Sequence, residues 1–185
     1  MEKLFSPWRL RYITSGRREG AGCVFCSVVR AKTDRANLIL ARGRLSFVIL
    51  NKYPYSNGHL MVVTNSHLAS LKDAPAGALE EMMHLAVRCE LALREVYRPS
   101  GINLGINLGR SAGAGIEGHL HLHLVPRWDG DTNFMTVIHG TRVIPEALTV
   151  TYRRLRPLIR REDPGRTTTR RRTTTPTRSG RRRRR

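Results

Sequence analysis

The chain has 185 residues with a formal net charge of +19, and 40% of its residues are hydrophobic, which suits one domain with a substantial core. Ten of its 33 basic residues are arginines within residues 164–185, where no acidic residue occurs, so the rest of the chain carries a net charge of +9, which suits an anionic ligand. Three cysteines argue against a disulfide framework, and the lack of any apolar run near ~18 residues argues against a transmembrane helix.

The N-terminal residues 1–22 form a basic arm that ends in glycines. Its first stretch, MEKLFSPWRLRYI, is mixed and charged and lacks the apolar segment and cleavage site of a signal peptide. We therefore expect a cytoplasmic protein that has no membrane partner.

The next segments, after CVFC at residues 23–26, predict a pair of strands. LSFVIL at 45–50 and HLMVVT at 59–64 are rich in β-branched and apolar residues, which favours β-structure. NKYPYSNG lies between them and has the proline and Asn-Gly pair of a loop. We expect a hairpin or an adjacent antiparallel pair.

A long helix is predicted over residues 76–97. Its apolar residues recur at spacings of three and four and predict one buried stripe: Leu79, Met82, Met83, Ala86, Cys89, Leu93, Val96 and Tyr97. Asp73 and Pro75 are a start signal, and RPSG ends the helix. Cys89 is expected to be an inert core thiol, and His84 a surface residue.

The second half of the domain predicts two more strands and a closing helix. INLGINLG at 102–109 is a strand with glycines, and the loop RSAGAGIEG leads from it to HLHLHLV at 119–125. A short helix is expected near PEALTVTYRRLRPLIR, and the low-complexity residues 164–185 are expected to be disordered. These elements predict an α+β fold, an antiparallel sheet with helices on one side.

The alternation in HLHLHLV places three histidines on one face of a strand. Positions i, i+2 and i+4 project together, so His119, His121 and His123 share one face while the intervening leucines enter the core. A merely polar face would show a mixture of residue types. Two sharper interpretations remain: the imidazoles bind a metal, or one attacks a phosphoryl centre while others stabilise its charge. The glycine-rich loop upstream supplies N–H groups for a phosphate.

The same segment resembles the histidine-triad (HIT) family, whose pattern alternates three histidines with apolar residues. FVILNKYPYSNGHLMVV and INLGRSAGAGIEGHLHLHLVPRW extend the resemblance, which covers roughly residues 4–150. SPWRLRYI, CVFC and RWDGDTNFMTVI are similar to the bacterial branch that splits diadenosine tetraphosphate by phosphorolysis. The resemblance implies a HIT domain at 23–163, with a sheet of about five strands and a long helix packed on it.

The resemblance also implies roles for single residues. His121 would be the nucleophile, oriented by the backbone carbonyl of His119, and His123 and His59 would contact the α-phosphate. Asn51 matches the family's contact to the ribose. Asn107, Gly115 and Ile116 match its contacts to the phosphates, and Ile49 and Leu50 match the lining of its base pocket. For Ile49 and Leu50, an interpretation as simple core residues is nearly as good.

CVFC is open to three interpretations: a redox pair, half of a zinc site, or coincidence. A redox pair of the thioredoxin type should open a helix after a strand, whereas CVFC follows a glycine-rich arm. The resemblance implies a zinc site made of Cys23, Cys26, His67 and His119. A Cys₂His₂ set leaves no open position, so this zinc would be structural. His139 has no matching role.

The expected activity is nucleotidyl transfer on dinucleoside polyphosphates. The resemblance implies attack on the α-phosphorus, a nucleotidyl-histidine intermediate, and inorganic phosphate as co-substrate, so that diadenosine tetraphosphate gives ATP and ADP. Arg110 and Arg127 are candidates to hold that phosphate, with the plain alternative of solvated surface charges.

Three alternatives and two partners remain open. A hydrolase of dinucleoside polyphosphates or of nucleotide phosphoramidates would use the same triad, and a nucleotide-binding or nucleic-acid-binding module would not turn over at all. The arginine-rich tail suits non-specific polyanion binding. The resemblance further implies a homodimer or higher homo-oligomer, formed through the long helix and an edge strand.

Overall fold

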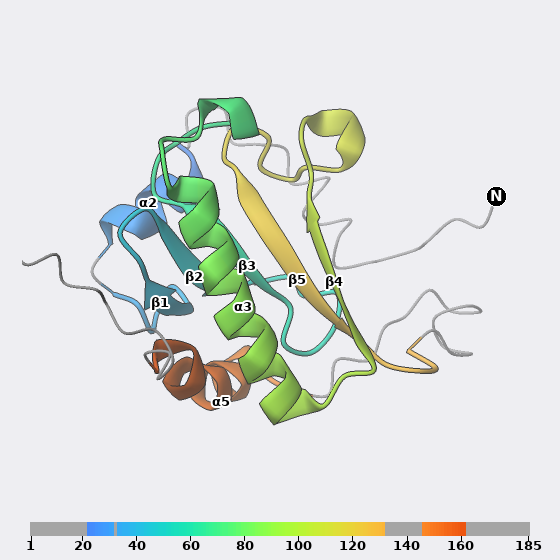
Figure 1. Ribbon diagram of the computed structural model, residues 1–185. Helices are drawn as coiled ribbons and strands as arrows, with labels where there is room; N and C mark the ends of the chain where they lie inside the picture. The colour runs from blue at the N-terminus through green and yellow to red at the C-terminus, as the bar shows by residue number, and fades with distance from the viewer. Residues whose placement is uncertain (1–21, 32, 132–145, 162–185) are drawn as a thin grey trace, which may run out of the picture.

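The computed structural model describes residues 22–31, 33–131 and 146–161, which form a five-stranded antiparallel sheet with helices on both faces (Figure 1). The strands are β1 (Ile39–Arg42), β2 (Ser46–Leu50), β3 (Leu60–Thr64), β4 (Gly101–Ile106) and β5 (His121–Arg127), in the spatial order β1-β2-β3-β5-β4. The predicted α+β class and the sheet of about five strands are confirmed.

The predicted β2–β3 pair is present with an unbroken register. Ser46 pairs with Thr64 and Leu50 with Leu60, and the NKYPYSNG segment connects them. Both strands are buried along their whole length because helices cover the two faces of the sheet. The edge strand β1 was not located from the sequence; it pairs with β2, with an irregularity between Ile39 and Ala41.

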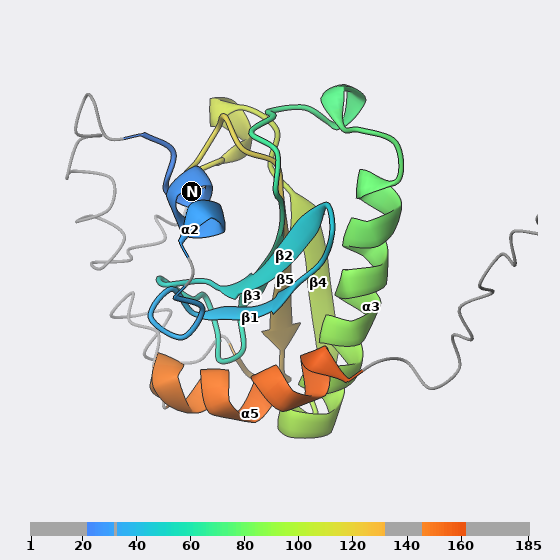
Figure 2. The same cartoon turned by 90° about the vertical axis from the view of Figure 1, so that its left-hand side faces the viewer.

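The predicted long helix is α3 (Ala78–Tyr97), which lies across one face of the sheet beside α5 (Leu148–Arg160) (Figure 2). The buried stripe differs from the prediction, because Leu79 and Met83 are exposed while Leu85 and Ala92 are buried. Cys89 is fully buried, as expected. The Glu81 carboxylate, at the start of α3, accepts hydrogen bonds from two backbone N–H groups in the β1–β2 turn, at 2.7 and 2.8 Å.

The opposite face of the sheet carries α2 (Val24–Arg30), a seven-residue helix that the sequence did not predict. Its Phe25 and Val28 pack on side chains of β1, β2 and β3. The expectation that helices lie on one side of the sheet is therefore wrong. The CxxC segment also opens a helix, with Cys23 as the residue that precedes its first turn. Two 3₁₀ turns, η1 (Leu71–Asp73) and η2 (Arg110–Ala112), complete the elements.

Several expectations fall on residues that lie outside the described ranges. These are the basic arm at 1–22 (apart from Gly22), the arginine-rich tail at 164–185 and His139. In the described part of the chain, no helix combines the length and apolar character needed to cross a bilayer.

Candidate active site

The register of β5 sets which way its histidines point. His121 pairs with Val63 and His123 with Met61, both residues of the cluster under α2. The alternate residues Leu122 and Leu124 belong to the core cluster under α3. His121 and His123 therefore share the α2 face, as predicted, and their ring centroids lie 4.8 Å apart.

His121 is held with one ring nitrogen bonded and the other available. Its Nδ1 lies 2.7 Å from the backbone carbonyl oxygen of His119, which can only accept a hydrogen bond, so Nδ1 carries the proton. Burial lowers the pKa of His121, and the hydrogen bond to His119 offsets part of that shift. The neutral ring thus has an unprotonated Nε2, the form that a nucleophile requires.

A chain of hydrogen bonds ends at His123. The backbone N–H of Tyr55 donates to Nδ1 of His59 at 3.1 Å, which leaves the proton of the neutral His59 ring on Nε2. That Nε2 lies 3.0 Å from Nδ1 of His123 and donates to it. A neutral His123 therefore carries its own proton on Nε2. Burial, followed by the neighbouring His123 and His121, lowers the pKa of His59 to about 3, so this ring stays neutral.

A cavity of about 510 Å³ opens beside these histidines on the α2 face. It is lined by all six predicted substrate contacts together with His121 and His123: Ile49, Leu50, Asn51, Asn107, Gly115 and Ile116. The side chain of Leu50 packs in the α3-side core, so the simple-core interpretation applies to it, whereas Ile49 belongs to the α2-side cluster. His59 is 1% exposed and lies behind His123, outside the residues that line the cavity.

Other lining residues were missed from the sequence. One wall is made by α2, and the loops before β1 and after β2 add polar side chains; the additional lining residues are Val24, Phe25, Val28, Ala36, Asn37, Leu38, Lys52, Tyr53, Tyr55, Met61 and Gly113. The only signal for the α2 wall was the apolar content of VFCSVVR. Tyr55 stacks on His59, with ring centroids 5.0 Å apart.

The two arginines expected near the phosphates lie elsewhere. The guanidinium of Arg127 makes hydrogen bonds to both carboxylate oxygens of Asp131 and to Asn103. The side chain of Arg110 is 90% exposed and lies 3.9 Å from the Glu117 carboxylate. Neither lines the cavity, and among the described lining residues Lys52 is the only lysine or arginine.

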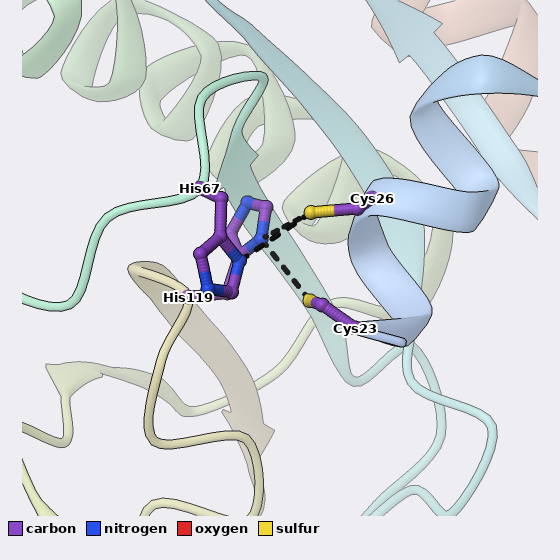
Figure 3. Close-up of side chains that lie close together, drawn as sticks. All are labelled: Cys23, Cys26, His67 and His119. Atoms are coloured by element: carbon purple, nitrogen blue, oxygen red, sulfur yellow. Dashed lines mark hydrogen bonds between the residues drawn. The ribbon is translucent and has the colours of Figure 1, made fainter. Parts of the chain in front are cut away.

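The four predicted metal ligands lie together, as Figure 3 shows. The ligand atoms of Cys23, Cys26, His67 and His119 are all within 4.8 Å of one another. The Sγ-to-Nδ1 distances are 3.3, 3.4 and 3.7 Å. Tetrahedral zinc with Zn–S of about 2.3 Å and Zn–N of about 2.0 Å places such atoms about 3.5 Å apart. The donor set and spacing therefore fit zinc.

His119 is oriented for this role by its other nitrogen. Nε2 lies 2.7 Å from the carbonyl oxygen of Thr64 and donates to it, which leaves Nδ1 unprotonated toward the two thiols. Metal-bound histidines are commonly held by such a hydrogen bond. The side chain of His119 thus belongs to the group of four candidate metal ligands, while its backbone carbonyl orients His121.

Comparisons with known proteins agree with this geometry. A family model described as the HIT domain matches residues 33–130. A Mycobacterium tuberculosis protein named AP-4-A phosphorylase is 37% identical over 84% of this chain and 83% of its own. A zinc-bound histidine triad family protein from Mycobacterium smegmatis is 30% identical, with a TM-score of 0.61 over 75% of this chain and 93% of its own. A hypothetical histidine triad nucleotide-binding protein from Sulfolobus tokodaii is 28% identical, with a TM-score of 0.59 over 74% of this chain and 91% of its own.

Proposed function

Because the chain belongs to the histidine-triad (HIT) family, we propose that it is a nucleotidyl-transfer enzyme that splits dinucleoside polyphosphates, diadenosine tetraphosphate above all. The observation that carries the proposal is the state of His121. Its Nδ1 proton is held by the His119 carbonyl, and the ring lines a cavity large enough for a nucleotide. The M. tuberculosis relative named AP-4-A phosphorylase supports the choice of substrate.

In the first step, Nε2 of His121 attacks the α-phosphorus of diadenosine tetraphosphate. A bond forms between Nε2 and phosphorus, and the bond from phosphorus to the bridging oxygen breaks, so ATP leaves with that electron pair. AMP remains on His121 as a phosphoramidate. The triphosphate is a good leaving group and needs little protonation.

His123 stabilises the charge that develops in this step. Its Nε2–H donates toward the phosphate oxygens, because Nδ1 is already occupied by the proton from His59. His59 acts through His123 as a positioning residue, which revises our expectation that it contacts the phosphate itself. The backbone N–H of Tyr55 keeps His59 in the required tautomer.

The nucleoside lies across the sheet, away from the histidines. His123, Met61 and Ile49 are register partners on successive strands, so Ile49 lies about 10 Å from His123, at roughly 4.8 Å per strand. That span suits a nucleoside, with the base between Ile49 and α2. Asn51 holds the ribose hydroxyls, and Asn107 with the loop at 113–116 faces the phosphates.

In the second step an acceptor attacks the phosphorus of the intermediate and His121 leaves. Inorganic phosphate as acceptor gives ADP, and water gives AMP. We assign phosphate as the co-substrate on the strength of the M. tuberculosis relative. Hydrolysis is the second candidate, and one observation favours it. Arg110 and Arg127 do not line the cavity, and Lys52 is the only lysine or arginine among the described residues that do.

We further propose that zinc occupies the Cys23, Cys26, His67 and His119 cluster. Four protein ligands complete a tetrahedron, so the metal supplies stability and holds α2 in place, and it takes no part in the chemistry. The fit of the sulfur-to-nitrogen distances and the zinc-bound M. smegmatis relative support this assignment.

A homodimer is the proposed assembly. Leu79, Met83, Val87 and Leu91 recur at every fourth residue of α3 and are exposed. Exposed Leu104 lies on β4, which is an edge strand of the sheet. A second copy would cover the apolar stripe and the open strand edge together. The cytoplasmic location and polyanion binding by residues 164–185 stay predictions.

Product analysis with and without inorganic phosphate tests the proposed activity. Diadenosine tetraphosphate should give ATP and ADP, and labelled phosphate should appear as the β-phosphate of ADP. Products of ATP and AMP, formed at a rate indifferent to phosphate, would identify a hydrolase. Absence of any product would support a binding module that does not turn over.

A further inference from the structure

The two residues inside the CVFC segment face the nucleotide cavity. Cys23 and Cys26, at its ends, belong to the metal cluster, while Val24 and Phe25 line the cavity. Val28, one turn further along α2, lines it as well. The short helix therefore has a metal side and a nucleotide side.

Phe25 contacts a residue of each site at once. It is 4% exposed, and its ring centroid lies 5.3 Å from the ring of His119 and 5.3 Å from the ring of His121. It also packs edge-on against Phe47, with ring centroids 6.4 Å apart. Together with His123, Phe25 confines the ring of His121, whose Nδ1 is fixed by the His119 carbonyl.

The helix that presents Phe25 is short and depends on its surroundings. It has seven residues, and Cys23 precedes it without making a side-chain capping hydrogen bond. A helix of that length is not stable in isolation, so its position depends on tertiary contacts. Phe25 and Val28 supply apolar contacts, and the guanidinium of Arg42 donates hydrogen bonds to three backbone carbonyl oxygens at the C-terminal end of the helix. The bonds from Cys23 and Cys26 to a metal would hold its first turn.

We propose that Phe25 is a positioning residue for His121, and that metal bound through Cys23 and Cys26 holds it there, so that metal binding and nucleotide binding are coupled. The inference rests on the proposed function, since it takes the ligand of the cavity to be a nucleotide. With metal bound, α2 closes one wall of the cavity and Phe25 restrains the nucleophile. Without metal, the first turn of α2, which carries Phe25, loosens, and the wall and the restraint weaken together.

Coupling of this kind is reciprocal. If metal raises the affinity for nucleotide by some factor, nucleotide raises the affinity for metal by the same factor. A metal that served folding alone, at a distance from the cavity, would show no such factor in the folded protein.

The test uses the whole chain and AMP as the probe, with affinity measured by calorimetry. Zinc-loaded protein should bind AMP at least tenfold more tightly than chelator-treated protein that circular dichroism shows to be folded. His67→Ala is the matched variant, because His67 is a metal ligand outside both α2 and β5. It should reproduce the weak AMP binding of metal-free protein even with zinc supplied, and competition titration should find wild-type zinc affinity raised by AMP by the same factor.

Two substitutions separate positioning from structure. Phe25→Leu keeps an apolar side chain in the wall and should retain most of the AMP affinity, whereas Phe25→Ala should lose it. With zinc bound, Phe25→Leu should lose a larger factor in kcat than in AMP affinity. Nitrogen NMR of His121 should show that the Nδ1–H tautomer is less populated in both variants and in metal-free protein.

The results that would overturn this inference differ from those that would overturn the proposed function. Equal AMP affinities with and without zinc, or an unchanged His121 tautomer in Phe25→Ala, would overturn the inference alone. Failure of zinc-loaded wild type to bind AMP would overturn the proposed function and this inference with it.

Discussion

Replacing His59 by glutamine should reduce the loss of folding stability that acidification causes. The pKa of His59 is lowered to about 3 in the folded state, chiefly by burial, while an unfolded histidine has a pKa near 6.5. The folded state thus binds fewer protons, and stability rises with pH. The contribution is fully present above about pH 6.5 and is lost as the pH falls toward 3.

The size of the effect follows from that interval. Each pH unit below 6.5 costs about 1.4 kcal/mol, so protonation linkage at His59 removes about 2 to 3 kcal/mol between pH 7 and pH 4.5. Glutamine does not titrate, and its amide can still donate to Nδ1 of His123. His119 and His121, whose pKa values are also lowered, contribute in the same direction in both proteins.

Urea unfolding at pH 7 and pH 4.5 measures the decrease in the free energy of unfolding between these two pH values. A chelator is present, so that metal release does not contribute. His59→Gln should lose about 2 to 3 kcal/mol less than wild type over this interval. His84→Gln is the matched control, because the His84 side chain is 42% exposed on α3, and it should lose as much as wild type. An equal loss in His59→Gln and wild type would refute the reasoning.

Three further predictions concern the metal, a tight turn and the tail. Protein purified without chelator should contain one zinc per chain by elemental analysis, and the double variant Cys23→Ser, Cys26→Ser should contain none; zinc retained by the variant would contradict the ligand set. Gly58→Ala should lower the free energy of unfolding by about 1 to 3 kcal/mol in urea titrations, because Gly58 has φ of +77° and an added Cβ would approach a buried leucine methyl to 2.9 Å. Gly101→Ala, which meets nothing within 4 Å, should cost less. Truncation after Asp163 should leave turnover within a few-fold of the full chain, and a large loss would show that the tail serves the active site.

The elements that could be predicted are those with a clear period or composition. α3 is long enough for its helical repeat to stand out, and β2 and β3 are rich in β-branched residues on either side of an evident loop. α2 has seven residues and β1 has four, too few for a period to show. The details of α3 were also missed, because the apolar residues on two of its faces are alike in sequence and differ only in what covers them.

The site shows the same division. The HLHLHL alternation predicts the shared face of His121 and His123. The four candidate metal ligands were predicted as one set only from the family resemblance. No sequence period distinguishes Ile49 from Leu50, because β2 is buried on both faces and every residue in it is apolar or small. The cavity wall made by Phe25 arises from packing between segments almost a hundred residues apart, which local sequence cannot report.

In the proposed reaction His121 becomes covalently nucleotidylated, and intact-protein mass measurement after a rapid alkaline quench tests this step most directly. Wild-type protein mixed with diadenosine tetraphosphate, without phosphate, should gain the mass of one AMP moiety, and fragmentation should place it on His121. His121→Ala should gain no mass and should lose turnover by about 10⁴-fold or more while AMP binding remains detectable. Turnover near the wild-type rate in His121→Ala, or an adduct on another residue, would contradict the account.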